Sequence, residues 1–92
     1  MKLNVLIVDD SPIMRRMIKK TIVLSGIETG SIREAGDGQE ALAQLEVHPV
    51  DILFVDINMP VMDGLELLER VKNQPENRDL SVFIISTESN EK

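Results

Sequence analysis

The sequence predicts a small α/β protein built on a parallel sheet, and two features of the chain support this fold class. Apolar runs rich in Val and Ile occupy residues 5–8, 50–55 and 82–85, as is typical of strands that are covered on both faces. Between these runs, apolar residues recur at three- and four-residue spacing, which indicates helices. Strands that alternate with helices over short loops favour a doubly wound parallel sheet with right-handed crossovers.

The first helix has the clearest boundaries. Ser11 is a suitable N-cap, Pro12 fits the first helical position because no N–H is needed there, and Gly26 favours a stop. We therefore expect a helix from about Pro12 to Ser25, with an apolar stripe of Ile13, Met14, Met17, Ile18, Thr21 and Ile22. The remaining elements are an edge strand, two helices and a last strand, expected at about 29–35, 38–47, 64–73 and 81–86. In the helix at 64–73 we expect an apolar stripe of Leu65, Leu68 and Val71. On the exposed side of the same helix we expect an ion pair between Glu66 and Arg70.

Polar side chains follow three of the predicted strands at the point where each strand ends. Asp9 and Asp10 follow the first run, Asp56 follows the run at 50–55, and Ser86 follows the last. In open α/β sheets, ligands bind outside the carboxyl ends of the strands. A single Asp in such a place is usually a helix cap or turn former, and a hydroxyl there commonly bonds local backbone. The three carboxylates together favour a functional site.

Such a cluster of carboxylates needs a cation or raised pKa values. Two unit charges about 5 Å apart repel by roughly 3 kcal/mol at an effective dielectric constant near 20. Oxygen ligands favour Mg²⁺ or Mn²⁺, and Mg²⁺ usually keeps several waters, which leaves room for a phosphoryl oxygen. A carboxylate can attack phosphorus to form an acyl phosphate, and Asp56 is the best candidate for this nucleophile.

The motifs LIVDDS at 6–11, DINMP at 56–60 and MDG at 62–64, followed by Ser86, occur in a distinctive order and spacing. In these motifs, from Lys2 to about Glu88, the chain closely resembles the receiver domain of bacterial response regulators, including the single-domain chemotaxis regulator. The resemblance implies a flavodoxin-like fold and a phosphoacceptor role in two-component signal transduction.

The resemblance also implies roles for single residues. Asp56 would accept a phosphoryl group from the phosphohistidine of a histidine kinase or phosphotransfer domain. Asp10, Asp56 and the backbone carbonyl of Asn58 would bind the metal, and Asp9 would act through a metal-bound water. Ser86 would supply the hydroxyl whose movement switches a partner-binding surface. A receiver catalyses only its own phosphorylation and dephosphorylation, so the chain is not expected to be an enzyme with other substrates.

The carboxyl-terminal part of the family pattern is missing from this sequence. Receivers continue with a fourth helix, a fifth strand ending in Lys-Pro and a fifth helix, whereas the sequence stops at Lys92. We expect a single receiver domain over residues 1–92 that lacks these elements, and we assign the active-site lysine role to no residue. The chain is expected to be either a fragment of a full receiver or, if whole, a protein that is unstable alone or that assembles as an oligomer by edge pairing or element exchange at its exposed fourth strand.

Composition excludes several classes of function. A net charge of −6, from 16 acidic and 10 basic residues, argues against direct binding to nucleic acid. The sequence has no Cys and therefore no disulfide framework or thiol chemistry. Its first apolar run is too short for a signal peptide or a membrane span, so we expect a cytoplasmic protein without a membrane partner.

Two further features have competing interpretations. The basic strip, defined as Arg15, Arg16, Lys19 and Lys20, is either a solvated helix face or a docking site for an acidic partner such as the kinase. His48, the only histidine, is interpreted as a structural residue at a helix end.

Two other classes of function compete with the phosphoacceptor role. One is a structural or oligomerising fragment that no longer switches. The other is a Mg²⁺-dependent phosphohydrolase with an Asp nucleophile. That chemistry usually needs a second Asp two residues after the nucleophile, and the presence of Asn58 at this position argues against it.

Overall fold

Strands and helices alternate along the chain, as the sequence predicts. The computed structural model describes residues 2–56, 64–75 and 79–85. The elements in these ranges are β1 (Leu3–Val8), α1 (Pro12–Leu24), β2 (Thr29–Ala35), α2 (Gly38–Val47), β3 (Ile52–Asp56), α3 (Gly64–Lys72) and β4 (Ser81–Ile85). The predicted Ser11 cap of α1 is confirmed, because the Met14 amide donates to Ser11 Oγ at 3.3 Å. Asp37 caps α2 in the same way, since its Oδ1 accepts from the Glu40 amide at 2.9 Å.

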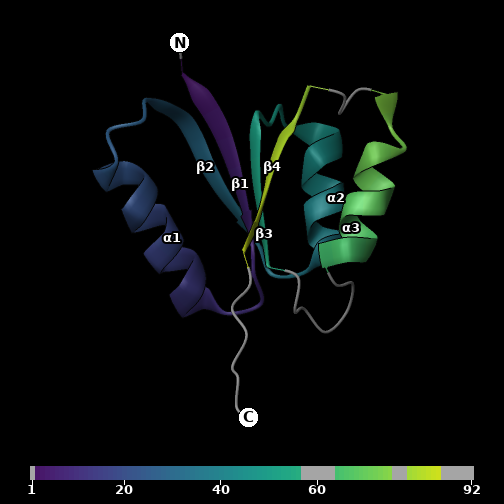
Figure 1. Ribbon diagram of the computed structural model, residues 1–92, viewed down its shortest axis with the longest axis horizontal. Helices are drawn as coiled ribbons and strands as arrows, with labels where there is room; N and C mark the ends of the chain where they lie inside the picture. Colours follow the sequence, from purple (N-terminus) through teal and green to yellow (C-terminus); the bar gives the residue numbers. More distant parts are fainter. Residues whose placement is uncertain (1, 57–63, 76–78, 86–92) are drawn as a thin grey trace.

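The four strands form one parallel sheet in the order β2-β1-β3-β4 (Figure 1). The predicted doubly wound α/β class is therefore confirmed for the described elements. From β1 the chain moves outward to β2, and it then crosses back to β3 on the other side of β1. The order of the strands thus reverses between β1 and β3, and in open α/β sheets ligands bind at such a point, beyond the carboxyl ends of the strands.

Helices cover both faces of the sheet, with α1 on one face and α2 and α3 on the other (Figure 1). The larger core cluster lies under α2 and α3 and includes Leu6, Leu53 and Val55 of the sheet. The smaller cluster lies under α1, where Ile22 packs with Val5 and Ile7. Both faces of β1 are therefore buried from Val5 to Val8, which explains why these four residues form an unbroken apolar run. Among the described helices, none has the length and apolar character needed to cross a membrane.

The apolar stripes of α1 and α3 differ in part from the predicted ones. In α3, Leu67 and Val71 are fully buried, while Leu65, expected in the core, is 64% exposed. The face of α3 that meets α2 and the sheet is therefore centred on Leu67. The Glu66–Arg70 pair is present on the exposed side at 3.3 Å. In α1, Ile22 is buried, but Ile13 and Met17 lie mostly in solvent. Among the described helices α1 alone covers this face, and it buries only the side turned toward the strands.

The two edges of the sheet have different character. β2 forms the predicted polar edge, and its Gly30 lies against Asn4 of β1. A Cβ at Gly30 would lie 2.5 Å from Asn4 Oδ1, which accepts hydrogen bonds from the amide and hydroxyl of Ser31. β4 forms the other edge, where Phe83 and Ile84 are each about half exposed. Phe83 contacts Phe54 of β3, with ring centroids 5.3 Å apart.

Candidate functional site

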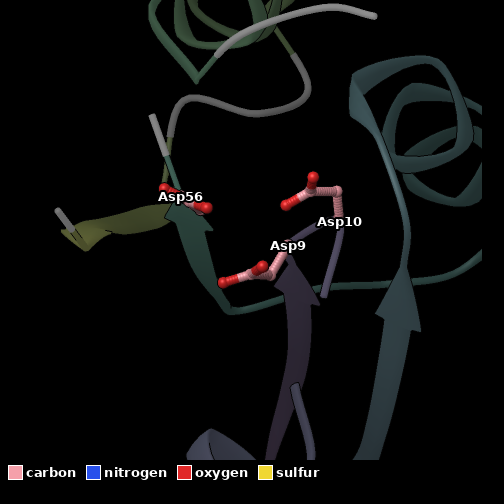
Figure 2. Close-up of side chains that lie close together, drawn as sticks. All are labelled: Asp9, Asp10 and Asp56. Carbon is pink, nitrogen blue, oxygen red and sulfur yellow. The ribbon is translucent and has the colours of Figure 1, made fainter. Parts of the chain in front are cut away.

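Three carboxylates meet beyond the ends of β1 and β3, at the point where the strand order reverses. Asp9 and Asp10 follow the last residue of β1, and Asp56 is the last residue of β3. Figure 2 shows the three side chains turned toward a common space, and one oxygen of each lies within 4.8 Å of the others. Asp9 and Asp56 are 1% and 2% exposed, whereas Asp10 is exposed to solvent. The structure therefore brings together the three predicted Asp residues.

The polar atoms of Asp9 are almost all engaged by neighbouring backbone or side chains. Its amide donates to the Ala35 carbonyl of β2 at 3.1 Å, and its carbonyl accepts from Arg15 Nη1 at 2.6 Å. Its Oδ1 accepts the Ser11 amide at 2.9 Å. Its Oδ2 is buried and has no hydrogen-bond partner among the described residues. This oxygen is therefore the one most available to a ligand.

The pKa of Asp9 lies above its ordinary value. Burial is the largest cause, and the negative charges of Asp56 and Asp10 raise the pKa further, while the hydrogen bond from the Ser11 amide partly opposes the shift. A carboxylate in this environment is poorly stabilised as an anion. A nearby cation would reverse the effect by favouring the ionised form.

The donor set of the site fits a hard divalent cation. All three side chains offer oxygen, which is the ligand atom that Mg²⁺ and Mn²⁺ prefer. In an octahedral Mg²⁺ site, opposite ligands lie about 4.2 Å apart, twice the usual metal–oxygen distance. One oxygen from each carboxylate lies within 4.8 Å of the other two, so the cluster has about the size of such a site. The buried and unbonded Oδ2 of Asp9 is a specific vacant acceptor of the kind that a cation or its bound water satisfies.

Two predicted site residues, Asn58 and Ser86, lie outside the described residues. The basic strip is divided in the structure. Arg15 turns inward, with Nε 2.9 Å from Glu34 Oε1, and its side chain is only 18% exposed. Arg16, Lys19 and Lys20 are exposed and line a shallow hollow of about 500 Å³ on the outer side of α1.

The sequence analysis missed the contact of Arg15 with the acidic site. Arg15 and Glu34 are 19 residues apart, and only the pairing of β1 with β2 brings them together. The sequence carries no periodic signal for such a contact. His48, in contrast, is where it was expected, because its amide donates to the Gln44 carbonyl at the end of α2.

Comparison with known proteins supports this interpretation of the fold. Residues 5–92 match the response regulator receiver domain. The chain is 37% identical to chemotaxis protein CheY1 of Helicobacter pylori over 87 residues, which are 94% of this chain and 68% of that protein. It is 34% identical to sensor protein EvgS of Escherichia coli K12 over 99% of its own length, but it spans only 7% of EvgS.

The solved structures agree with the sequence comparison. The chain superposes on the chemotaxis response regulator CheY4 of Vibrio cholerae with a TM-score of 0.83 and 34% identity, covering 98% of this chain and 72% of that one. The described fold, the three carboxylates at the point where the strand order reverses, and the match over residues 5–92 are all consistent with the same family. The chain belongs to the family of response regulator receiver domains.

Proposed function

We propose that this receiver accepts a phosphoryl group on the Asp56 carboxylate, in a Mg²⁺-dependent transfer from the phosphohistidine of a histidine kinase or phosphotransfer domain. The observation that carries the proposal is the convergence of Asp56 with Asp9 and Asp10 at the reversal point of the sheet. In the reaction, an Asp56 oxygen forms a bond to phosphorus, the phosphorus–nitrogen bond to the donor histidine breaks, and the imidazole leaves with the electron pair of that bond.

Each carboxylate has a separate part in this proposal. Asp10 and Asp56 would hold the Mg²⁺ or Mn²⁺ ion, and Asp9, whose buried Oδ2 has no hydrogen-bond partner among the described residues, would act through a water. When bound, the ion offsets negative charge on the transferring group. The backbone carbonyl of Asn58 as a further metal ligand, and Ser86 as the switch hydroxyl, are inferred from the family motif.

The partner and the setting of the reaction follow from the same proposal. The exposed cations of α1, Arg16, Lys19 and Lys20, provide a docking site for the donor protein. Transfer between two proteins of a two-component pathway places the receiver in the cytoplasm. Asp56 serves as an acceptor and not as a nucleophile that turns over small phosphomonoesters, so the protein is a signalling module and not an enzyme with other substrates.

The proposal is tested by intact-mass spectrometry after incubation with Mg²⁺ and acetyl phosphate. The wild-type chain should gain one phosphoryl group that is labile to base, and chelation of the metal should prevent the gain. Asp56→Asn should gain none. The control is Asp79→Asn, which removes a charge from an exposed residue far along the chain and should be labelled like the wild type.

Two outcomes would contradict the proposal. An adduct that persists in Asp56→Asn would place the acceptor elsewhere. If the wild-type chain shows no adduct while circular dichroism shows an intact fold, the alternative of a structural or oligomerising fragment is favoured. The exposed apolar residues of β4 support that alternative.

A further inference from the structure

Arg15 connects three elements around the acidic site. It lies in the first turn of α1, and its Nε donates to Glu34 Oε1 of β2 at 2.9 Å. Its Nη1 donates to the Asp9 carbonyl, just beyond β1, at 2.6 Å. Its own amide donates to the Ser11 carbonyl at 3.0 Å. The side chain of Arg15 therefore holds the Asp9 end of the segment 9–11, and its backbone amide holds the Ser11 end.

The contact with the Asp9 carbonyl bears directly on the two carboxylates that follow β1. The peptide between Asp9 and Asp10 is planar, so the direction of its carbonyl also sets the direction of the Asp10 amide and the position of the Asp10 Cα. The Asp9 amide is already held by Ala35 of β2. With the carbonyl held by Arg15 as well, rotation of this peptide requires the loss of a hydrogen bond from a charged donor, the stronger kind in proteins.

The charge of Arg15 is balanced by its partner Glu34. The pair has side chains that are 18% and 36% exposed, and the guanidinium is oriented by the carboxylate of Glu34. The cation is therefore paired within the protein, and its influence on the acidic site is geometric. Glu34 restricts the rotamers of Arg15, and Arg15 in turn directs the carbonyl of Asp9.

We propose that Arg15 is a positioning residue for the acidic site, which holds the Asp9–Asp10 peptide so that both carboxylates face Asp56. The expected effect on Mg²⁺ binding rests on the proposed function. The effect of Arg15 on the orientation of the Asp9–Asp10 peptide does not, because it concerns the protein without metal. Arg15 is therefore not part of the docking surface on α1, because its Nε and Nη1 already have partners within the chain.

The test compares Arg15→Ala with Arg16→Ala, which removes the same charge from the next residue on the exposed side of α1. Two quantities are measured on the full chain: the Mg²⁺ dissociation constant by calorimetry, and the hydrogen-exchange rate of the Ser11 amide by NMR without metal. Arg15→Ala should weaken Mg²⁺ binding about 10-fold, the lower range for loss of a group that orients a metal ligand. It should also speed exchange at Ser11, whose amide is bonded to Asp9 Oδ1. Arg16→Ala should change neither.

Two further variants separate positioning from general stability. Arg15→Lys retains one donor for the carbonyl and should have a Mg²⁺ affinity between those of the wild type and Arg15→Ala. Glu34→Gln removes the ion pair but leaves the bond to Asp9, so it should have a smaller effect than Arg15→Ala. If Arg15→Ala does not fold, Arg15→Met, which keeps the aliphatic stem but removes both donors, decides, and wild-type Mg²⁺ affinity with wild-type Ser11 exchange in Arg15→Met would overturn the inference.

The outcomes also distinguish this inference from the proposed function. A wild-type chain that binds no Mg²⁺ contradicts the proposed function, and Ser11 exchange then decides the role of Arg15. A wild-type chain that binds Mg²⁺ while Arg15→Ala behaves like Arg16→Ala in both measurements overturns the role of Arg15 and leaves the phosphoacceptor proposal standing.

Discussion

The burial of Asp9 beside two other carboxylates opposes folding when no cation is present. Its pKa is raised above the ordinary value of 3.8 by burial and by the charges of Asp56 and Asp10. Between the unfolded and the folded pKa, the folded chain therefore binds more protons than the unfolded chain. The free energy of unfolding should fall as the pH rises through this interval and stay lower at neutral pH.

Asp9→Asn should therefore stabilise the metal-free protein at pH 7 by about 1–2 kcal/mol, part of the repulsion expected between charges at this spacing. The amide oxygen of Asn can still accept from Ser11. Urea unfolding at several pH values measures the free energy of unfolding of both proteins. The difference in this free energy between Asp9→Asn and the wild type should shrink as the pH falls toward 3.8. Millimolar Mg²⁺ should stabilise the wild type more than Asp9→Asn, because ligands stabilise the state that binds them.

The control for this measurement is Asp79→Asn, which also removes one negative charge but lies outside the acidic cluster. Its free energy of unfolding at pH 7 should be close to that of the wild type. A metal-free Asp9→Asn protein that is less stable than wild type at pH 7 would contradict the expected repulsion among the three carboxylates.

The sequence was sufficient to predict the acidic site but not its surroundings. Asp9 and Asp56 directly follow an apolar run and Asp10 is the next residue after Asp9, so the end of a buried strand determines where each carboxylate lies. The contact of Arg15 with the Asp9 carbonyl depends instead on strand pairing and on one side-chain rotamer. In the sequence, Arg15 has the same appearance as Arg16, which is exposed.

Helix α1 presents a mixed basic and apolar face to solvent. Arg16, Lys19 and Lys20 recur at helical spacing with Val23 and Leu24, and these five residues line the hollow on the outer side of the helix. Val23 and Leu24 are 59% and 75% exposed. A surface of this kind fits a partner helix with acidic and apolar side chains, because charge complementarity speeds association and the apolar contact slows dissociation.

Charge reversal on this face should weaken phosphoryl transfer from a protein donor. Lys19→Glu is expected to slow labelling of Asp56 by a phosphorylated histidine phosphotransfer domain about 10-fold at low salt, and less at high salt where charges are screened. Labelling by acetyl phosphate should not change, because this small donor needs no docking surface. The matched control is Lys72→Glu at the exposed end of α3. Equal loss with both donors would reject docking at α1.

Helices were predictable as elements, whereas their buried faces were less so. In α3 the spacing of Leu65, Leu68 and Val71 is consistent with one stripe, yet the neighbours of the helix bury Leu67 and leave Leu65 exposed. Several apolar residues allow more than one stripe, and only the packing partners decide between them. Gly30 shows the same limit, since its contact with Asn4 depends on the register of β1 against β2.

At the scale of the whole molecule, the sheet has one protected edge and one exposed apolar edge. β2 carries polar and charged residues, as is common on edges that must not pair with other chains. β4 contains no charged residue, and Phe83 and Ile84 are 50% and 52% exposed. On the α1 face, an apolar hollow of about 410 Å³ lies between Met14 and Met17 of the helix and Phe54 and Ile85 of the sheet. Apolar surface is thus available along the β4 side of the described fold.

The 92-residue chain should therefore associate through β4, since an uncharged edge strand offers both backbone hydrogen bonds and apolar side chains to a second copy. Sedimentation equilibrium should show a mass that rises with protein concentration. Ile84→Lys places a charge on the edge and should weaken association at least about 10-fold, a change of roughly 1.4 kcal/mol. Leu65→Lys replaces an apolar residue of α3 that is somewhat more exposed than Ile84, and this variant should associate like the wild type. A folded wild-type monomer at every concentration would refute edge pairing, and equal association of the two variants would place the contact on another surface.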